Sequence, residues 1–104
     1  MPFTPAPAPS ANTDTPFDKT LTVAGTAEDL VTVPAGLVGM RFSVINRGPG
    51  VATIAFDRTA TPADTRLHAG ESYSEDGINV VTRVSFINVT AGKEPRLTGV
   101  LWSG

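Results

Sequence analysis

The chain has no cysteine and a single histidine, and these two shortages exclude several kinds of chemistry. Without cysteine there is no disulfide framework, no thiolate metal site and no cysteine nucleophile. One histidine, His68, does not supply the three or four ligands that zinc usually takes. We therefore expect no metal and no cofactor, and a small domain whose stability comes from packing or from partners that complete its core.

A strong charge of either sign is also missing, since eight Lys and Arg against ten Asp and Glu give a formal net charge of -2. Nucleic-acid binders usually carry a basic stripe, and this chain has none. No apolar run approaches the ~20 residues that cross a bilayer. Residues 1–5 lack the basic start and the apolar stretch of a signal peptide. We expect a protein that binds neither nucleic acid nor membrane and that is made in the cytoplasm, leaving it only as part of a larger particle.

The hydroxyl and imidazole side chains form no recognisable nucleophilic set. His68 lies close in sequence to Ser72 and Ser74, and a histidine base beside a serine is the usual arrangement for acyl transfer. The segment between them contains a Gly and is expected to turn, so the hydroxyl groups need not face the ring. The sequence predicts that the protein has no catalytic residues.

Acidic side chains gather over one short segment, at Glu71, Glu75 and Asp76. Glycosidases use two carboxylates across a cleft, whereas carboxylates on one hairpin are usually just solvated. Asp57 and Asp64 could join Glu75 and Asp76 around a calcium ion, which takes six to eight oxygen ligands. No calcium-loop motif is present, and we expect no metal site here.

The N-terminal segment is rich in proline. Five of the nine prolines fall within residues 1–18, at positions 2, 5, 7, 9 and 16. The run at 5–9 favours an extended polyproline II conformation and cannot join the middle of a sheet. Such a segment is either a solvated terminus or an arm that lies across a neighbouring subunit, and its two phenylalanines favour the arm. We predict an extended arm over residues 1–18 and a folded domain over residues 19–104.

The apolar side chains of the arm are the predicted partner-binding residues, together with the single tryptophan. Trp102, close to the C-terminus, is expected to be a core or interface plug and not a platform for a sugar ring. The predicted set is Phe3, Pro5, Pro7, Pro9, Phe17 and Trp102.

From residue 19 onward the pattern is typical of β-strands, with no helical periodicity. Short runs rich in β-branched residues alternate with turn signals at intervals of ~8–12 residues. The expected strands cover residues 20–23, 30–33, 40–46, 51–56, 65–68, 71–74, 78–89 (one long strand or two short ones) and 97–102. About eight short strands predict an all-β fold, an antiparallel β-sandwich that is jelly-roll-like.

Two local connections carry strong turn chemistry. Residues 47–50, Arg-Gly-Pro-Gly, place a proline between two glycines. They predict that residues 40–56 form a β-hairpin. Asp76-Gly77 is a pair that supplies positive φ, and it predicts a turn between residues 71–74 and 78–81.

Several short motifs follow one another along the chain: the strand and strand end 42–48, the strand 51–57, the segment 59–61, the corner Leu67-His68-Ala69-Gly70-Glu71-Ser72, the strand 84–88 and the C-terminal segment 96–102. Their order resembles that of the small β-sandwich accessory proteins of tailed-bacteriophage virions. The resemblance covers roughly residues 40–102 and leaves out the arm. It implies a head-decoration, head-fibre-base or similar virion component, often oligomeric, and it transfers no catalytic residues.

These observations predict a non-enzymatic structural component of a phage or phage-like virion, docked by its arm and one sheet edge. The expected partners are the major capsid protein or another virion protein, and further copies of the chain in a trimer or similar oligomer. One rival is a receptor- or carbohydrate-binding module of a phage fibre, which would use Tyr73, Trp102 and the 57–65 loop. The other is a small cupin-like enzyme, which one histidine disfavours.

Overall fold

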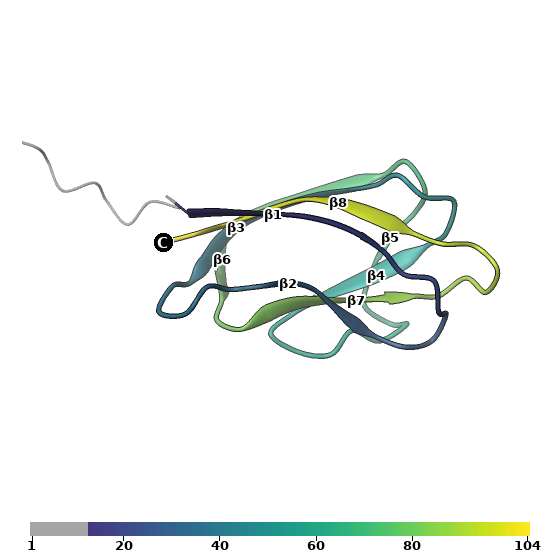
Figure 1. Ribbon diagram of the computed structural model, residues 1–104, viewed down its shortest axis with the longest axis horizontal. Helices are drawn as coiled ribbons and strands as arrows, with labels where there is room; N and C mark the ends of the chain where they lie inside the picture. Colours follow the sequence, from purple (N-terminus) through teal and green to yellow (C-terminus); the bar gives the residue numbers. More distant parts are fainter. Residues whose placement is uncertain (1–12) are drawn as a thin grey trace, which may run out of the picture.

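The computed structural model describes residues 13–104, and within that range every regular element is a β-strand (Figure 1). The strands are β1 (Thr13–Thr20), β2 (Glu28–Thr32), β3 (Gly39–Asn46), β4 (Ala52–Phe56), β5 (Thr65–Leu67), β6 (Ser72–Val80), β7 (Arg83–Asn88) and β8 (Arg96–Ser103). They form two four-stranded antiparallel sheets, which confirms the all-β sandwich. Residues 13–104 contain no helix with the length and apolar character needed to cross a membrane.

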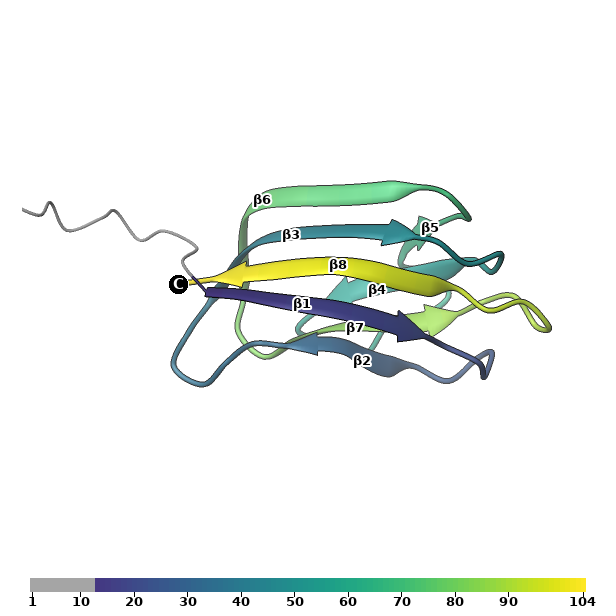
Figure 2. The same ribbon diagram turned by 45° about the horizontal axis from the view of Figure 1, so that its top comes forward.

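The two sheets have the strand orders β1-β8-β3-β6 and β2-β7-β4-β5. Strands from the two halves of the chain pair in nested fashion, β1 with β8, β2 with β7, β3 with β6 and β4 with β5. The chain is therefore one long hairpin rolled up, with two further pairings, β3–β8 and β4–β7, that complete the sheets. This arrangement is a jelly roll, and Figure 2 shows β1, β8, β3 and β6 lying side by side.

The core lies between the sheets and is centred on Phe42. Its ring stacks on Phe17 with centroids 5.6 Å apart and meets Phe56 edge-on at 5.5 Å, while Tyr73 lies 6.4 Å away at a tilt. Such aromatic pairs contribute about 0.5–1.5 kcal/mol each beyond their buried area. The other fully or nearly fully buried members of this core are Leu21, Leu30, Val31, Val44, Ala52, Ile54, Leu67, Val80, Val84, Phe86, Leu97 and Leu101.

The first strand lies seven residues earlier than predicted, at Thr13–Thr20 and not at 20–23. Residues 13–18, assigned from sequence to the arm, are thus part of the sheet. Proline is tolerated because β1 is an edge strand and alternate residues face its only neighbour. The Arg47 amide donates to the Arg96 carbonyl (2.7 Å). In β8 the backbone N–H and C=O groups of even-numbered residues therefore face β3, and those of odd-numbered residues face β1. Pro16, opposite Val100, has its nitrogen on the open side.

The predicted hairpin over residues 40–56 is wrong, because β3 and β4 lie in different sheets. The connection is held by distant backbone and not by a turn of its own. A Cβ on Gly48 would lie 2.2 Å from the Glu94 carbonyl oxygen, and a Cβ on Gly50 would lie 2.6 Å from the Lys93 oxygen. These glycines let the connection pass under the residues that precede β8, from one sheet to the other.

The predicted turn at Asp76-Gly77 is also wrong, since both residues lie inside β6. The register with β3 shifts there: Arg41 is opposite Asp76, while Gly39 is opposite Val80. Over the same length, β3 advances by two residues and β6 by four. The extra residues of β6 form a bulge at Gly77, which has φ 69°. The Asp-Gly pair supplies the positive φ that its sequence indicates, but for a bulge.

Candidate interaction surface

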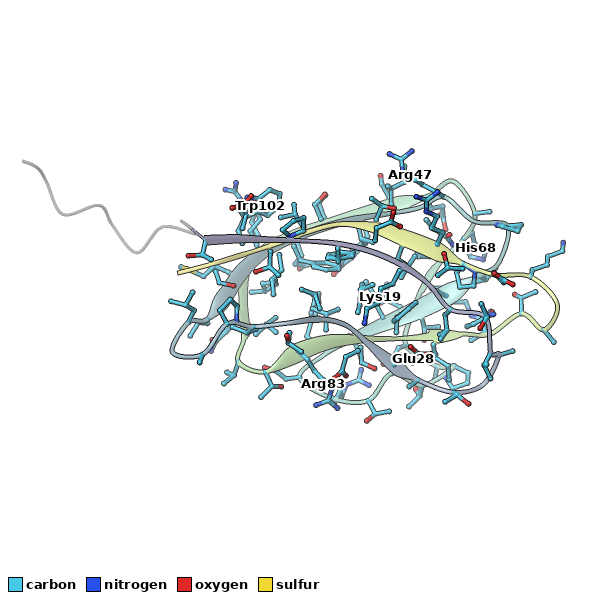
Figure 3. All side chains as sticks on the ribbon, in the orientation of Figure 1. Lys19, Glu28, Arg47, His68, Arg83 and Trp102 are labelled. Atoms are coloured by element: carbon cyan, nitrogen blue, oxygen red, sulfur yellow. The ribbon has the colours of Figure 1, made fainter. Side chains whose placement is uncertain are left out.

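The broadest structured surface is the side of the β1-β8-β3-β6 sheet that points away from the core, here called the outer face. At one end of it Asp14, Trp102, Arg41 and Asp76 lie in a row across the four strands. Arg41 Nε lies 2.8 Å from an Asp76 carboxylate oxygen, and the Arg41 guanidinium carbon lies 5.7 Å from the centre of the Trp102 ring. Trp102 is half-buried and belongs to this face, not to the core (Figure 3).

The middle of the outer face mixes apolar and hydroxyl side chains, since the row of Pro16 and Val100 continues with Ser43 and Ser74. Pro16 of β1 lies beside Val100 of β8, and Ile45 of β3 lies one row further along. Val100 and Ile45 are half-buried and Pro16 is exposed. Apolar and hydroxyl side chains bordered by arginine and carboxylate groups are a composition compatible with a protein–protein contact surface.

The other end of the outer face holds the pair Asp18 and Arg96. Arg96 donates from Nε (2.9 Å) and Nη2 (2.7 Å) to the two carboxylate oxygens, and the Thr98 hydroxyl donates to the same group (3.3 Å). The Arg96 hydrogen bonds hold the pKa of Asp18 below its usual value. This bidentate pair ties β1 to β8 at this end of the outer face.

Phe17 points from the opposite side of β1 into the sandwich, where it stacks on Phe42. It therefore helps to build its own domain and does not project from an arm, which corrects its sequence assignment. A groove of about 310 Å³ opens beside it, between the edge strands β1 and β2, and is lined in part by Leu30. The Lys19 ammonium bridges this groove by donating to the Asp29 carbonyl (2.6 Å).

The remaining predicted partner-binding residues, Phe3, Pro5, Pro7 and Pro9, lie outside the described residues. Their role stays a prediction from sequence.

His68 and Ser74 have separate partners. The Glu71 carboxylate accepts from the His68 amide (2.6 Å) and lies 2.7 Å from Nδ1 of its ring, and these contacts hold the pKa of Glu71 below its usual value. The Ser74 hydroxyl donates to the Ser43 hydroxyl across two strands (3.2 Å). Glu71 thus closes the turn before β6.

The acidic residues considered for calcium do not converge. Asp64 is paired with Arg58, which lowers its pKa, and Glu75 accepts from the Tyr73 hydroxyl. Burial and Glu75 raise the pKa of Tyr73 to about 12. Within residues 13–104, no three His, Asp or Glu side chains are grouped so as to hold a metal ion.

Asp57 has a separate structural role at the end of β4. Its carboxylate accepts from the amides of Val81 (2.8 Å), Thr82 (2.7 Å) and Arg83 (3.3 Å) and from the Thr82 hydroxyl. Burial raises its pKa, but these donors outweigh that effect and hold the pKa below its usual value. Asp57 also has φ 58°, a conformation that Asp, Asn and Gly tolerate. One side chain therefore fixes the β6–β7 connection.

We expect Asp57→Ala to lower the free energy of unfolding by about 1–2 kcal/mol, because several charge-assisted hydrogen bonds are lost from an exposed site. Asp57→Asn keeps the backbone conformation and part of the bonding, and it should cost less. Because the folded-state pKa is depressed, the carboxylate stabilises the fold above its unfolded pKa and loses that effect as pH falls through the folded pKa. Urea unfolding at pH 7 and pH 3 should show the gap between wild type and Asp57→Asn narrowing at the lower pH; a constant gap would contradict this.

No structural role was predicted from sequence for two buried asparagines that set the loops at one end of the sandwich. Asn46 ends β3 and Asn88 ends β7, and both are almost completely inaccessible to solvent. Each accepts, through Oδ1, the amide of the residue two positions later, Gly48 and Thr90 respectively. The one sequence signal was that Ile-Asn recurs at the ends of two expected strands.

No protein-family model matches this chain, and no curated protein matches it.

Proposed function

We propose that this chain is a non-enzymatic structural component of a phage or phage-like virion, a capsid-decoration, cement or fibre-base protein. It attaches to the particle through its N-terminal arm and a sheet edge, and its partners are the major capsid protein or another virion protein and further copies of itself. The observation that carries the proposal is spatial. The chain enters β1 at Thr13, opposite Ser103, so the arm joins the domain beside Trp102 at the charged end of the outer face.

The chemistry of this region suits binding. The arm sequence is apolar and proline-rich, and a proline-rich segment has less conformational entropy to lose when it becomes ordered. The outer face places three apolar side chains, Pro16, Val100 and Ile45, between paired charges. Many copies on a symmetric lattice would turn one weak contact into stable attachment. The resemblance of residues 40–102 to phage accessory proteins agrees with this use of a jelly roll.

The test is to replace residues 2–12 by a Gly/Ser sequence of the same length and to measure co-sedimentation with the particle. The replacement must stop before Thr13, because removing residues 13–18 would delete most of edge strand β1. We expect a folded domain, with unchanged far-ultraviolet circular dichroism, that no longer sediments with the particle. Full co-sedimentation of the variant would show that the arm does not carry attachment.

The rival assignment is a receptor- or carbohydrate-binding module, and the position of Trp102 on the outer face is the observation that favours it. Arg41 lies over one side of that ring, so a sugar would have to displace it or stack elsewhere. A glycan array separates the two assignments: reproducible hits that Trp102→Ala abolishes would favour the module.

A further inference from the structure

The outer edge of β6 presents regularly spaced backbone groups that have no hydrogen-bond partner among residues 13–104. The Asn46 amide donates to the Glu71 carbonyl (2.9 Å), and this pair continues the β3–β6 register. In an antiparallel pair, successive residues direct their backbone N–H and C=O groups alternately toward the neighbouring strand and away from it. Tyr73 and Glu75 therefore also direct their backbone groups toward β3. The amides and carbonyls of Ser72, Ser74 and Asp76 consequently face away from the sheet, at the edge seen in Figure 2.

The other three sheet edges are obstructed. Pro16 interrupts the outer edge of β1, as described above. The register of β2 shifts between Asp29 and Val31, and Lys19 already occupies the Asp29 carbonyl. The fourth edge strand, β5, has three residues. Edge strands in soluble proteins are normally blunted by such devices. The bulge of β6 at Gly77 follows Ser72–Asp76, so this stretch is the regular open edge in the described part of the chain.

The sequence of residues 4–10, Thr-Pro-Ala-Pro-Ala-Pro-Ser, matches this edge. These residues lie outside the described part, and the argument uses their sequence alone. In an added strand alternate residues turn their backbone groups toward the sheet. With prolines at 5, 7 and 9 facing away, the missing donors all lie on the solvent side, where proline is tolerated. The amides of Thr4, Ala6, Ala8 and Ser10 then face the sheet.

A chain cannot place this segment on its own β6. An added strand would lie four strand spacings from β1, or about 19 Å. The three links from Ser10 to Thr13 span at most about 11 Å, and even the five links from Ala8 reach only about 18 Å before any reversal of direction. Because the connection is too short, the added strand must come from a second copy of the chain. The segment carries no charge, so Glu75 and Asp76 do not repel it.

We infer that residues 4–10 of one copy add as a strand to the β6 edge of another copy. Ser72, Ser74 and Asp76 exchange backbone hydrogen bonds with the residues between the prolines. The prolines then lie on the same side as Tyr73, which offers a half-buried ring. Each copy gives one arm and receives one, so the contact is heterologous and closes into a ring or continues as a chain. The inference concerns contacts between copies and does not depend on a virion.

The test uses purified full-length protein and measures mass by sedimentation equilibrium over a concentration series. Ala6→Pro/Ala8→Pro removes two donors on the sheet-facing side, whereas the matched control Pro5→Ala/Pro7→Ala removes two prolines on the other side. Ser74→Pro removes an outward-facing amide of β6 and leaves the β3–β6 ladder intact. We expect concentration-dependent oligomers for wild type and the control, and self-association at least about tenfold weaker for the other two variants.

Mixing provides the decisive result. Ala6→Pro/Ala8→Pro copies can still receive an arm, and Ser74→Pro copies can still give one. Each alone should be monomeric, and the mixture should form a 1:1 heterodimer. A monomeric wild type, or variants that associate as wild type does, would overturn the inference. Particle binding is not measured here, so failure of this experiment is distinct from failure of the proposed function.

Discussion

Gly99→Ala should leave little or no folded protein. Gly99 lies in the central strand β8 opposite Val44, and a Cβ there would lie 1.9 Å from the Ser43 carbonyl oxygen and 2.8 Å from the Val44 Cα. Both atoms belong to the backbone of β3, so no side chain can rotate away. Separating β3 from β8 would open the middle of a sheet and the core beneath it. We expect a loss of at least about 4 kcal/mol, a large part of the stability of a domain of this size.

The matched control is Gly25→Ala. Gly25 has φ 81°, but a Cβ there would meet nothing within 4 Å. Its cost is the backbone strain alone, on the order of 1–2 kcal/mol. Soluble yield and thermal unfolding followed by circular dichroism compare the two variants. If both unfold at the same temperature, the close approach of β3 and β8 at Gly99 is incorrect.

Asn46→Ala should cost about 3–4 kcal/mol, because it removes the hydrogen-bond partner of three buried backbone groups and of one partly buried one. Asn46 Nδ2 donates to the carbonyls of Gly50 (2.7 Å) and Leu67 (3.0 Å), and Oδ1 accepts from the amides of Gly48 (3.0 Å) and Arg96 (3.3 Å). One amide side chain thus joins the β3–β4 connection to the end of β5 and the start of β8. Urea unfolding at pH 7 gives the free energy directly.

Two comparisons make this result specific. Asn88→Ala removes three such bonds, to Leu21, Lys93 and Thr90, and should cost somewhat less. Asn79→Ala changes an exposed asparagine of β6 and should stay within about 0.5 kcal/mol of wild type. Equal effects for Asn46→Ala and Asn79→Ala would mean that the buried hydrogen bonds contribute nothing to stability.

The fold class was predictable because strand patterns are local. In β3 the alternation of Arg41, Phe42 and Val44 between solvent and core is visible in the sequence and holds in the structure. The start of β1 was not predictable in the same way. Pro16 argues against a strand until its edge position is known, and the contact of Phe17 with Phe42 comes from tertiary packing.

The partner of a strand depends on distant chain segments. Residues 47–50 have the composition of a hairpin turn. In the structure they pack against the backbone of residues 93–95, more than forty positions away, and connect the two sheets. The charged pairs of the outer face share this property, since Arg41 meets Asp76 and Arg96 meets Asp18 only through strand register. The sequence therefore predicted Trp102 as a binding residue but did not predict that Arg41 lies over its ring.

The nested pairing of the strands gives the molecule a polarity along its length. Thr13 and Ser103 are neighbours, so the chain enters and leaves the sandwich at one end, while residues 21–27, 47–50 and 89–95 form loops at the other (Figure 1). If the entry end is held by neighbours, the loop end points away from them. A foreign peptide inserted beside Gly92, where a Cβ would meet nothing within 4 Å, would then be carried outward. On the proposed function, the end that attaches and the end that is displayed would be separated by the full length of the strands.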